Sequence, residues 1–202
     1  TITVSSGLAL APHLYDWYFD GENDYIEVAE AMGMSNMSKV TVLAFNKFNA
    51  VDKVNPVVLL RLLSPASYLR VVNYVEGSLQ VEFNDGTNLH YIDPGDNVVS
   101  AGKWYLSGCM LDLESNILYL IIDTTVWSKE IDPAVSNISV DYIHIAKQAG
   151  YYGYGLFAFV RIYNRTVAEA EIDSSYSNHV VNASKMVLFL DPTFYNGTHY
   201  ID

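Results

Sequence analysis

The chain has 202 residues, of which half are hydrophobic and only 17% are charged. This composition excludes a disordered chain, because disorder needs few apolar residues and much charge. The 23 acidic and 11 basic residues give a formal net charge of −12, and the basic residues form no run. A nucleic-acid-binding surface is therefore not expected, since it needs clustered Lys and Arg.

Short segments with alternating hydrophobic residues recur along the whole chain and are separated by Gly, Asn, Asp and Pro. Tight turns such as Asp20-Gly21 and Asp85-Gly86 connect them. About fourteen short strands in this pattern indicate two stacked antiparallel sheets. The predicted strands are Thr1–Ser5, Asp16–Asp20, Tyr25–Ala29, Lys39–Phe48, Val57–Leu63, Tyr68–Val75, Ser78–Asn84, Asn88–Ile92, Trp104–Leu113, Ile117–Asp123, Thr125–Lys129, Ser139–Ala146, Leu156–Tyr163 and Lys185–Leu190.

Helical signal is limited to one turn over Ala29–Met34 and another over Thr166–Ile172, with Thr166 as its cap. No stretch approaches the roughly 18 apolar residues that a membrane helix needs, so no membrane span is expected. No linker divides the chain, which predicts one domain over residues 1–202 with a core at 14–172. Residues 1–6 and 185–202 are strand-like tails, which pair either within the chain or with the sheet of a neighbouring subunit.

Four phrases occur in a fixed order along the chain. They read YFDGENDYIEV at 18–28, MSNMSKVTVLAF at 34–45, KWY at 103–105 with LYLIID at 118–123, and FAFVRIYNRTVAEAEI at 157–172. Together they resemble the laminin-G-like and concanavalin-A-like jelly rolls. Phe45 stands where Trp is common, and Thr124 replaces a usual Gly. The resemblance implies an all-β, two-sheet jelly-roll sandwich with at most one or two helical turns. The C-terminal phrase at 190–198 resembles the lead-in to another such module, which leaves open a fragment of a longer protein.

Glycosidases on this fold place three carboxylates at alternating positions of one strand. Glu130 with Asp132 and Glu171 with Asp173 begin that pattern, but both lack the third acid. The five histidines are scattered without a pair at metal-ligand spacing. We therefore expect no enzyme. A pairing of Arg161 with Glu171 is the expected structural role of those two residues.

Acidic turns leave Ca²⁺ open as a ligand, because related jelly rolls bind this ion at the rim of the sandwich through carboxylates and carbonyls. A turn-forming role is the commoner reason for Asp in such loops. No other cofactor is expected. The residues concerned are Asp20, Asp24, Asp85, Asp93 and Asp96.

A Gly-flanked aromatic loop contains Tyr151, Tyr152 and Tyr154. Tyrosine offers apolar area with a polar tip, which suits either sugar stacking or packing against a protein. The three tyrosines are therefore the candidate contacts for a ligand or partner.

Five Asn-x-Ser/Thr sequons occur where chance predicts roughly two, and they favour a glycosylated, exported protein. A chain that begins with Thr1 instead of Met suits the same interpretation. Cys109 lies in an apolar run and is expected to be a buried, inert thiol. The candidate glycosylation sites are Asn36, Asn137, Asn164, Asn182 and Asn196.

These features predict an extracellular, non-catalytic structural or adhesive glycoprotein of the cell surface. In the first hypothesis its copies assemble into a filament or layer by exchange of terminal strands. The alternative is a lectin or adhesin module that binds glycans, with or without Ca²⁺.

Overall fold

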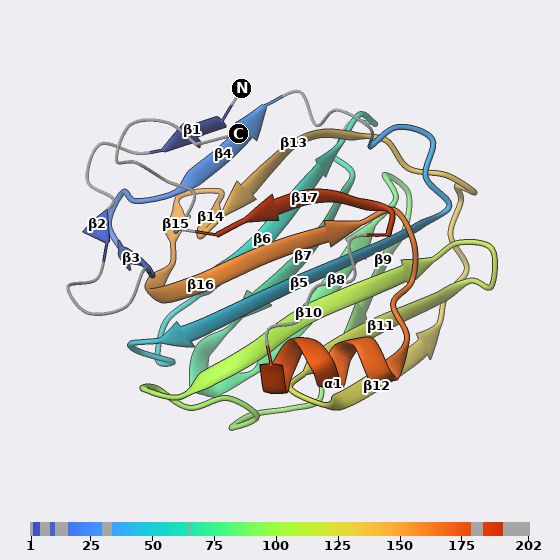
Figure 1. Ribbon diagram of the computed structural model, residues 1–202. Helices are drawn as coiled ribbons and strands as arrows, with labels where there is room; N and C mark the ends of the chain where they lie inside the picture. The colour runs from blue at the N-terminus through green and yellow to red at the C-terminus, as the bar shows by residue number, and fades with distance from the viewer. Residues whose placement is uncertain are drawn as a thin grey trace.

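The computed structural model describes residues 2–4, 9–10, 16–29, 34–64, 66–178 and 184–191. Two antiparallel sheets stack face to face in a jelly-roll sandwich (Figure 1), which confirms the predicted fold class. The first sheet has seven strands, in the spatial order β1 (Ile2–Val4), β4 (Ile26–Ala29), β13 (Val140–Ile145), β6 (Asn55–Leu62), β7 (Tyr68–Asn73), β8 (Leu79–Asn84) and β9 (Leu89–Ile92).

The second sheet has eight strands. Strand β17 pairs with the C-terminal half of β16, beside the ladder that β16 forms with β3. The spatial order is β12 (Thr125–Glu130), β11 (Ile117–Ile122), β10 (Trp104–Asp112), β5 (Lys39–Phe48), β16 (Tyr154–Tyr163), β3 (Trp17–Asp20) and β2 (Ala9–Leu10), with β17 (Met186–Leu190) off this path.

The predicted strands correspond to strands of the structure, most of them to within two residues at each end. Alternation did not reveal β2 or the small ladder of β14 (Lys147–Gln148) and β15 (Tyr151–Tyr152), because two-residue strands are too short to show a period. The turn predicted at Ala29–Met34 falls mostly outside the described residues. A 3₁₀ turn, η1, spans Val75–Gly77.

The predicted second helical segment is in fact the longer helix α1 (Glu169–Asn178), and Thr166 does not cap it. Ala168 occupies the N-terminal cap position. Its backbone N–H donates to Oε2 of Glu171 (2.9 Å), while the N–H of Glu171 donates to the carbonyl of Ala168 (2.9 Å). This is the glutamate half of a capping box, and it fixes where the helix begins.

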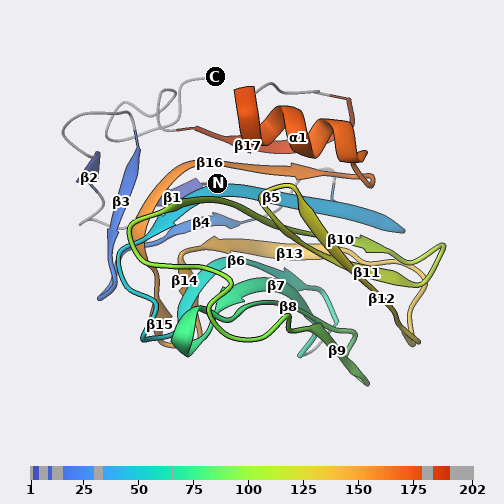
Figure 2. The same ribbon diagram turned by 90° about the horizontal axis from the view of Figure 1, so that it is seen from below.

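Helix α1 covers the outward face of the eight-stranded sheet (Figure 2). Val167 and Ile172 pack there against a second hydrophobic cluster that includes Leu43, Met110 and Phe159. Strand β10 is therefore buried on both faces, and all its residues after Trp104 are buried. The main core lies between the two sheets and contains Cys109, which is fully buried as expected.

The outward face of the seven-stranded sheet has no helix over it in the part of the chain that the structure describes. Inward residues such as Ile143, Leu69 and Phe83 belong to the core, so the residues that alternate with them point outward. These outward residues are largely polar or aromatic. This uncovered surface, which we call the polar face, is where a ligand could reach the sheet.

Both described tail segments pair inside the chain. Strand β1 forms an antiparallel ladder with β4, and β17 forms one with β16. The last residues, 192–202, lie outside the described part. The described helices include none long and apolar enough to cross a membrane.

Candidate functional site

Two rows of outward side chains run across the polar face, because cross-strand partners stand directly opposite each other in an antiparallel sheet. The register of the ladders between β4, β13, β6, β7, β8 and β9 gives both rows. The first row is Glu27, His144, Leu59, Arg70, Glu82 and Tyr91. The second row is Ala29, Tyr142, Arg61, Tyr68, Asn84 and Leu89.

Aromatic rings form a continuous path from the β15 hairpin onto this face. The ring centroids of Tyr152 and Tyr25 are 6.3 Å apart, those of Tyr25 and His144 6.0 Å, and those of His144 and Tyr142 4.6 Å. We call these four residues the tyrosine stripe. The side chains of its three tyrosines are half-buried, so each presents part of its ring to solvent.

Polar contacts hold the stripe in place. Nε2 of His144 lies 2.7 Å from a carboxylate oxygen of Glu27, and Nζ of Lys147 lies 3.5 Å from the centroid of the Tyr25 ring. Burial lowers the pKa of His144, although the hydrogen bond to Glu27 opposes this shift. The lowered pKa favours the neutral imidazole, whose ring can pack between two tyrosines.

The middle of the polar face contains a second group, the Glu82 cluster of Tyr68, Arg70, Tyr74 and Glu82. Nη2 of Arg70 donates to Oε2 of Glu82 (2.6 Å) and to the hydroxyl of Tyr74 (2.9 Å). The hydroxyls of Tyr74 and Tyr68 donate to the two carboxylate oxygens of Glu82, at 2.6 and 3.2 Å.

Burial of the Tyr74 hydroxyl, together with its hydrogen bond to Glu82, raises the pKa of Tyr74 to about 12. The guanidinium of Arg70 also lies over the Tyr68 ring, 4.7 Å from its centroid. These contacts fix the Tyr68 ring as a wall of the face, although Nε of Arg70 is buried without a hydrogen-bond partner among the described residues.

The predicted loop tyrosines separate into two places. Tyr152 belongs to the tyrosine stripe, and Tyr151, beside it in β15, has a strongly exposed side chain. Tyr154 lies elsewhere, because β16 belongs to the other sheet. Its ring packs edge-on against Tyr18 and has Nζ of Lys53 at 4.6 Å from its centroid.

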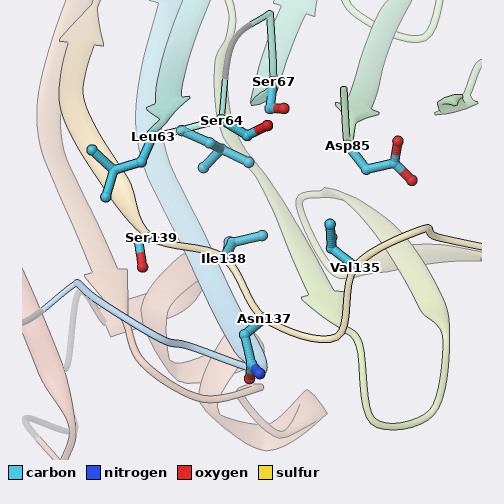
Figure 3. Close-up of a pocket in the computed structure, with 9 residues that line it drawn as sticks. Leu63, Ser64, Ser67, Asp85, Val135, Asn137, Ile138 and Ser139 are labelled. Carbon is cyan, nitrogen blue, oxygen red and sulfur yellow. The ribbon is translucent and has the colours of Figure 1, made fainter. Parts of the chain in front are cut away.

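A pocket of about 210 Å³ opens at one end of the sandwich (Figure 3). The turn after β6 and the loop before β13 form its walls, and Asp85 closes one side. The hydroxyl of Ser67 is buried in it without a hydrogen-bond partner. The pocket contains no aromatic side chain, so it offers a sugar ring no stacking surface. Its lining residues are Leu62, Leu63, Ser64, Ser67, Asp85, Val135, Asn137, Ile138 and Ser139.

The carboxylates that begin the glycosidase pattern do not gather at a site. Glu130 and Asp132 are exposed at the end of β12, and Glu171 and Asp173 lie on α1. The expected ion pair of Arg161 with Glu171 is wrong. Arg165 forms it instead, with two bonds of 2.7 Å. The reason is that Arg161 is buried beneath α1, where its guanidinium lies 3.8 Å from the Phe159 ring centroid.

The acidic residues considered for Ca²⁺ act in turns. Asp20 accepts backbone N–H bonds from Glu22 and Asn23, and these bonds lower its pKa. Asp24 accepts the N–H of Asp20, and Asp93 accepts that of Gly95. Asp85 accepts three backbone N–H groups, from Thr87, Asn88 and Ala134. Asp96 is exposed in a turn. Within the described ranges, no three His, Cys, Asp or Glu side chains gather in a way that could hold a metal ion.

Three of the five sequons lie in the described part of the chain. Asn36 and Asn137 have exposed side chains, whereas Asn164 is half-buried. In Figure 3 the Asn137 side chain points away from Ser64 and Ser67 on the opposite wall of the pocket. Asn182 and Asn196 lie outside the described residues.

No protein-family model matches the sequence, and no curated protein matches it. Several solved structures share the fold. One is the ligand-binding domain of botulinum neurotoxin serotype D in complex with N-acetylneuraminic acid, with a TM-score of 0.66 and 12% identity over 87% of this chain. The chain spans only 45% of that domain.

Two smaller proteins match over most of their own length. The heptameric SAP-like pentraxin of Limulus polyphemus has a TM-score of 0.60 and 11% identity, with 87% of this chain and 90% of the pentraxin covered. The carbohydrate-binding module of a Ruminococcus gnavus sialidase, bound to α2,3-sialyllactose, also has a TM-score of 0.60 and 11% identity. The match covers 79% of this chain and 95% of the module. The likeness supports the two-sheet jelly-roll sandwich described above. At these identities the likeness shows the fold alone.

Sequence reasoning missed most of the polar face. Tyr25, Tyr142 and Arg61 come from three separate segments of the sequence, and each one alone is typical of an ordinary outward residue. The available signal was the alternation of side chains along a strand, which places each of these residues on the outward side of its segment. That signal does not reveal which strands are neighbours.

Proposed function

We propose that the protein is an extracellular, non-catalytic glycan-binding module of lectin or adhesin type, which binds saccharides on the polar face. The tyrosine stripe is the observation that supports this most directly. A pyranose ring has apolar C–H faces, which pack well on the electron-rich face of an aromatic ring. Beside the stripe, Arg61, Tyr68 and Asn84 supply polar groups for sugar hydroxyls.

The neighbours in fold support the same proposal. Their descriptions name N-acetylneuraminic acid and sialyllactose as bound sugars, and cell entry of botulinum neurotoxin type C depends on two ganglioside molecules. The family proposed from the four sequence phrases, the laminin-G-like jelly rolls, shares this sandwich architecture.

The positions of the carboxylates on the polar face favour binding over hydrolysis. Glu27 and Glu82 are four strands apart in one row, which is about 19 Å at the usual strand spacing. A glycosidase needs its two carboxyl groups roughly 5–9.5 Å apart. Glu82 also accepts bonds from Arg70 and Tyr74, so it is not poised as a nucleophile.

Filament assembly by strand exchange has less support. Strands β1 and β17 pair within the chain. Nζ of Lys129 donates to the carbonyl of Tyr91 on edge strand β9 (3.2 Å), and a lysine in such a position hinders the addition of a further strand.

A glycan array with the secreted protein tests the proposal. Tyr142→Ala and Tyr152→Ala are each expected to lower the affinity for the bound glycans about tenfold, which is the loss typical of an anchor side chain. Tyr142→Phe keeps the ring and should retain most of the affinity. Tyr176→Ala, at an exposed tyrosine on α1, is the matched control. If the wild type binds no glycan, or if all four variants bind equally, the proposal is wrong.

A further inference from the structure

Among the described residues, Arg61 differs from the other arginines because no partner contacts its guanidinium. Arg70 pairs with Glu82, Arg165 pairs with Glu171, and Arg161 packs on Phe159. Arg61 is half-buried on the polar face, yet among the described residues its guanidinium has no hydrogen bond, ion pair or ring contact. This is unexpected in a protein with 23 acidic residues.

The two residues that stand directly opposite Arg61 are aromatic, and Asp141, the exposed extra residue of the β13 bulge, forms no ion pair with it in the described part of the chain. In the second row Tyr142 stands directly opposite it on β13, and Tyr68 stands directly opposite it on β7. The two acids of the adjacent row already have partners. Glu27 lies 2.7 Å from His144, and Glu82 lies 2.6 Å from Arg70. Neither carboxylate is therefore free to turn toward Arg61.

A guanidinium that is half-buried loses part of its hydration and gains no ion pair in return. Its planar fork of N–H donors matches the two oxygens of a carboxylate, and such paired bonds are stronger than those between neutral groups. The flanking tyrosines limit the directions from which an anion can approach. Tyr142 is also the end of the tyrosine stripe, so an anion at Arg61 adjoins the proposed sugar platform.

We propose that Arg61 binds the carboxylate of an acidic sugar, whose ring or its neighbour packs on Tyr142. This inference rests on the proposed glycan-binding function and names its substrate class. The overall charge of −12 limits the ligand further. Polyanions such as heparin are repelled by the protein as a whole. A saccharide with a single acid gains the short-range contact at Arg61 without that penalty, and a sialic or uronic acid at a chain end fits this description.

The test compares matched ligands on the intact protein. Binding is measured by calorimetry for an oligosaccharide that ends in sialic or uronic acid, for its methyl ester, for the neutral oligosaccharide without the acidic sugar, and for heparin. The variants are Arg61→Gln and Arg61→Lys. Lys103→Gln is the matched control, because Lys103 is an exposed cation next to β10 of the eight-stranded sheet and so lies away from the polar face.

Arg61→Gln should lower the affinity for the acidic oligosaccharide roughly 10- to 100-fold, which is the range expected for charge-assisted hydrogen bonds. The affinity for the neutral oligosaccharide should not change. The methyl ester should bind wild type as weakly as the neutral ligand does, and Arg61→Lys should recover only part of the affinity. Lys103→Gln should bind like wild type.

Other results would overturn the inference in distinguishable ways. If neutral and acidic ligands bind equally and Arg61→Gln changes neither affinity, Arg61 does not bind a carboxylate, although the glycan-binding function stands. If heparin binds more tightly than the singly charged ligand, the substrate class is wrong. If no saccharide binds, the proposed function itself fails.

Discussion

The backbone N–H of Asn36 donates a hydrogen bond of 2.9 Å to Oγ of Ser139, 103 positions away in the sequence. This bond joins two sequons, because Ser139 is the hydroxyl residue of the sequon at Asn137. The middle residues, Met37 and Ile138, are buried and exchange two backbone hydrogen bonds of 2.8 Å. Both asparagines remain exposed, so each could carry a glycan in the folded protein.

Ser139→Ala should therefore have two effects. It removes the acceptor of the Asn36 amide, which is expected to cost about 0.5–1 kcal/mol of unfolding free energy, and it destroys the sequon at Asn137. Ser139→Thr retains the hydroxyl and should show neither effect. Urea unfolding of protein made in bacteria and the intact mass of protein secreted by eukaryotic cells measure the two effects separately. Equal stability and equal glycan number in both variants would contradict the prediction.

The Glu82 cluster should be sensitive to the loss of one partner. Glu82→Gln leaves the largely buried Arg70 guanidinium without its carboxylate, and about 3 kcal/mol of stability should be lost. The double variant Arg70→Met with Glu82→Leu should be more stable than Glu82→Gln, since no unpaired charge remains. Chemical denaturation of the three proteins gives the comparison.

Glu114→Gln provides the control for this prediction. Glu114 pairs with Lys39 at 2.8 Å, but the pair is largely exposed. Exposed ion pairs contribute little to stability, so this variant should unfold close to wild type. A loss as large as that of Glu82→Gln would mean that burial does not explain the difference.

Asp16 is expected to destabilise the folded protein at neutral pH. Burial raises the pKa of Asp16 to about 6, and Asp191 raises it further while Lys47 opposes the shift. The folded protein thus keeps a proton that the unfolded chain releases near pH 3.8, the ordinary value. The contribution of Asp16 to the free energy of unfolding should consequently fall as the pH rises from about 4 to 6, and this loss should persist above pH 6.

Asp16→Asn removes that penalty. The variant should be more stable than wild type by about 1–2 kcal/mol at pH 7 and nearly equal to it at pH 4. Thermal unfolding across this pH range measures the difference. A constant difference at all pH values would show that titration of Asp16 is not its cause.

Cys109 should be inert in the folded protein. Burial raises the pKa of its thiol to about 12, from an ordinary value of 9.0. At pH 8 the thiolate is then roughly a thousandfold scarcer than in the unfolded chain. Iodoacetamide should label the native protein only as fast as it opens, and urea should accelerate labelling sharply. Complete labelling within minutes in native buffer would contradict the burial of this residue.

The sequence by itself determined the class of the fold and most of its strands. Long alternating segments such as Lys39–Phe48 specify both the strand and its inward residues, because a period of two requires one face to be buried. It also determined that Cys109 is buried. The helix was recognised only in part, since its beginning depends on Glu171 folding back onto the N–H of Ala168.

The candidate site was decided by tertiary structure. Of the loop tyrosines, Tyr152 joined the polar face whereas Tyr154 faces another cluster, because β15 and β16 belong to different ladders. Tyr142 and Arg61 are neighbours only because β13 pairs with β6 in one particular register. Strand order and register come from pairing between distant segments, and a shift of one residue would turn these side chains into the core. Local patterns indicate whether each side chain faces inward or outward, but only the assembled sheet decides which residues are neighbours.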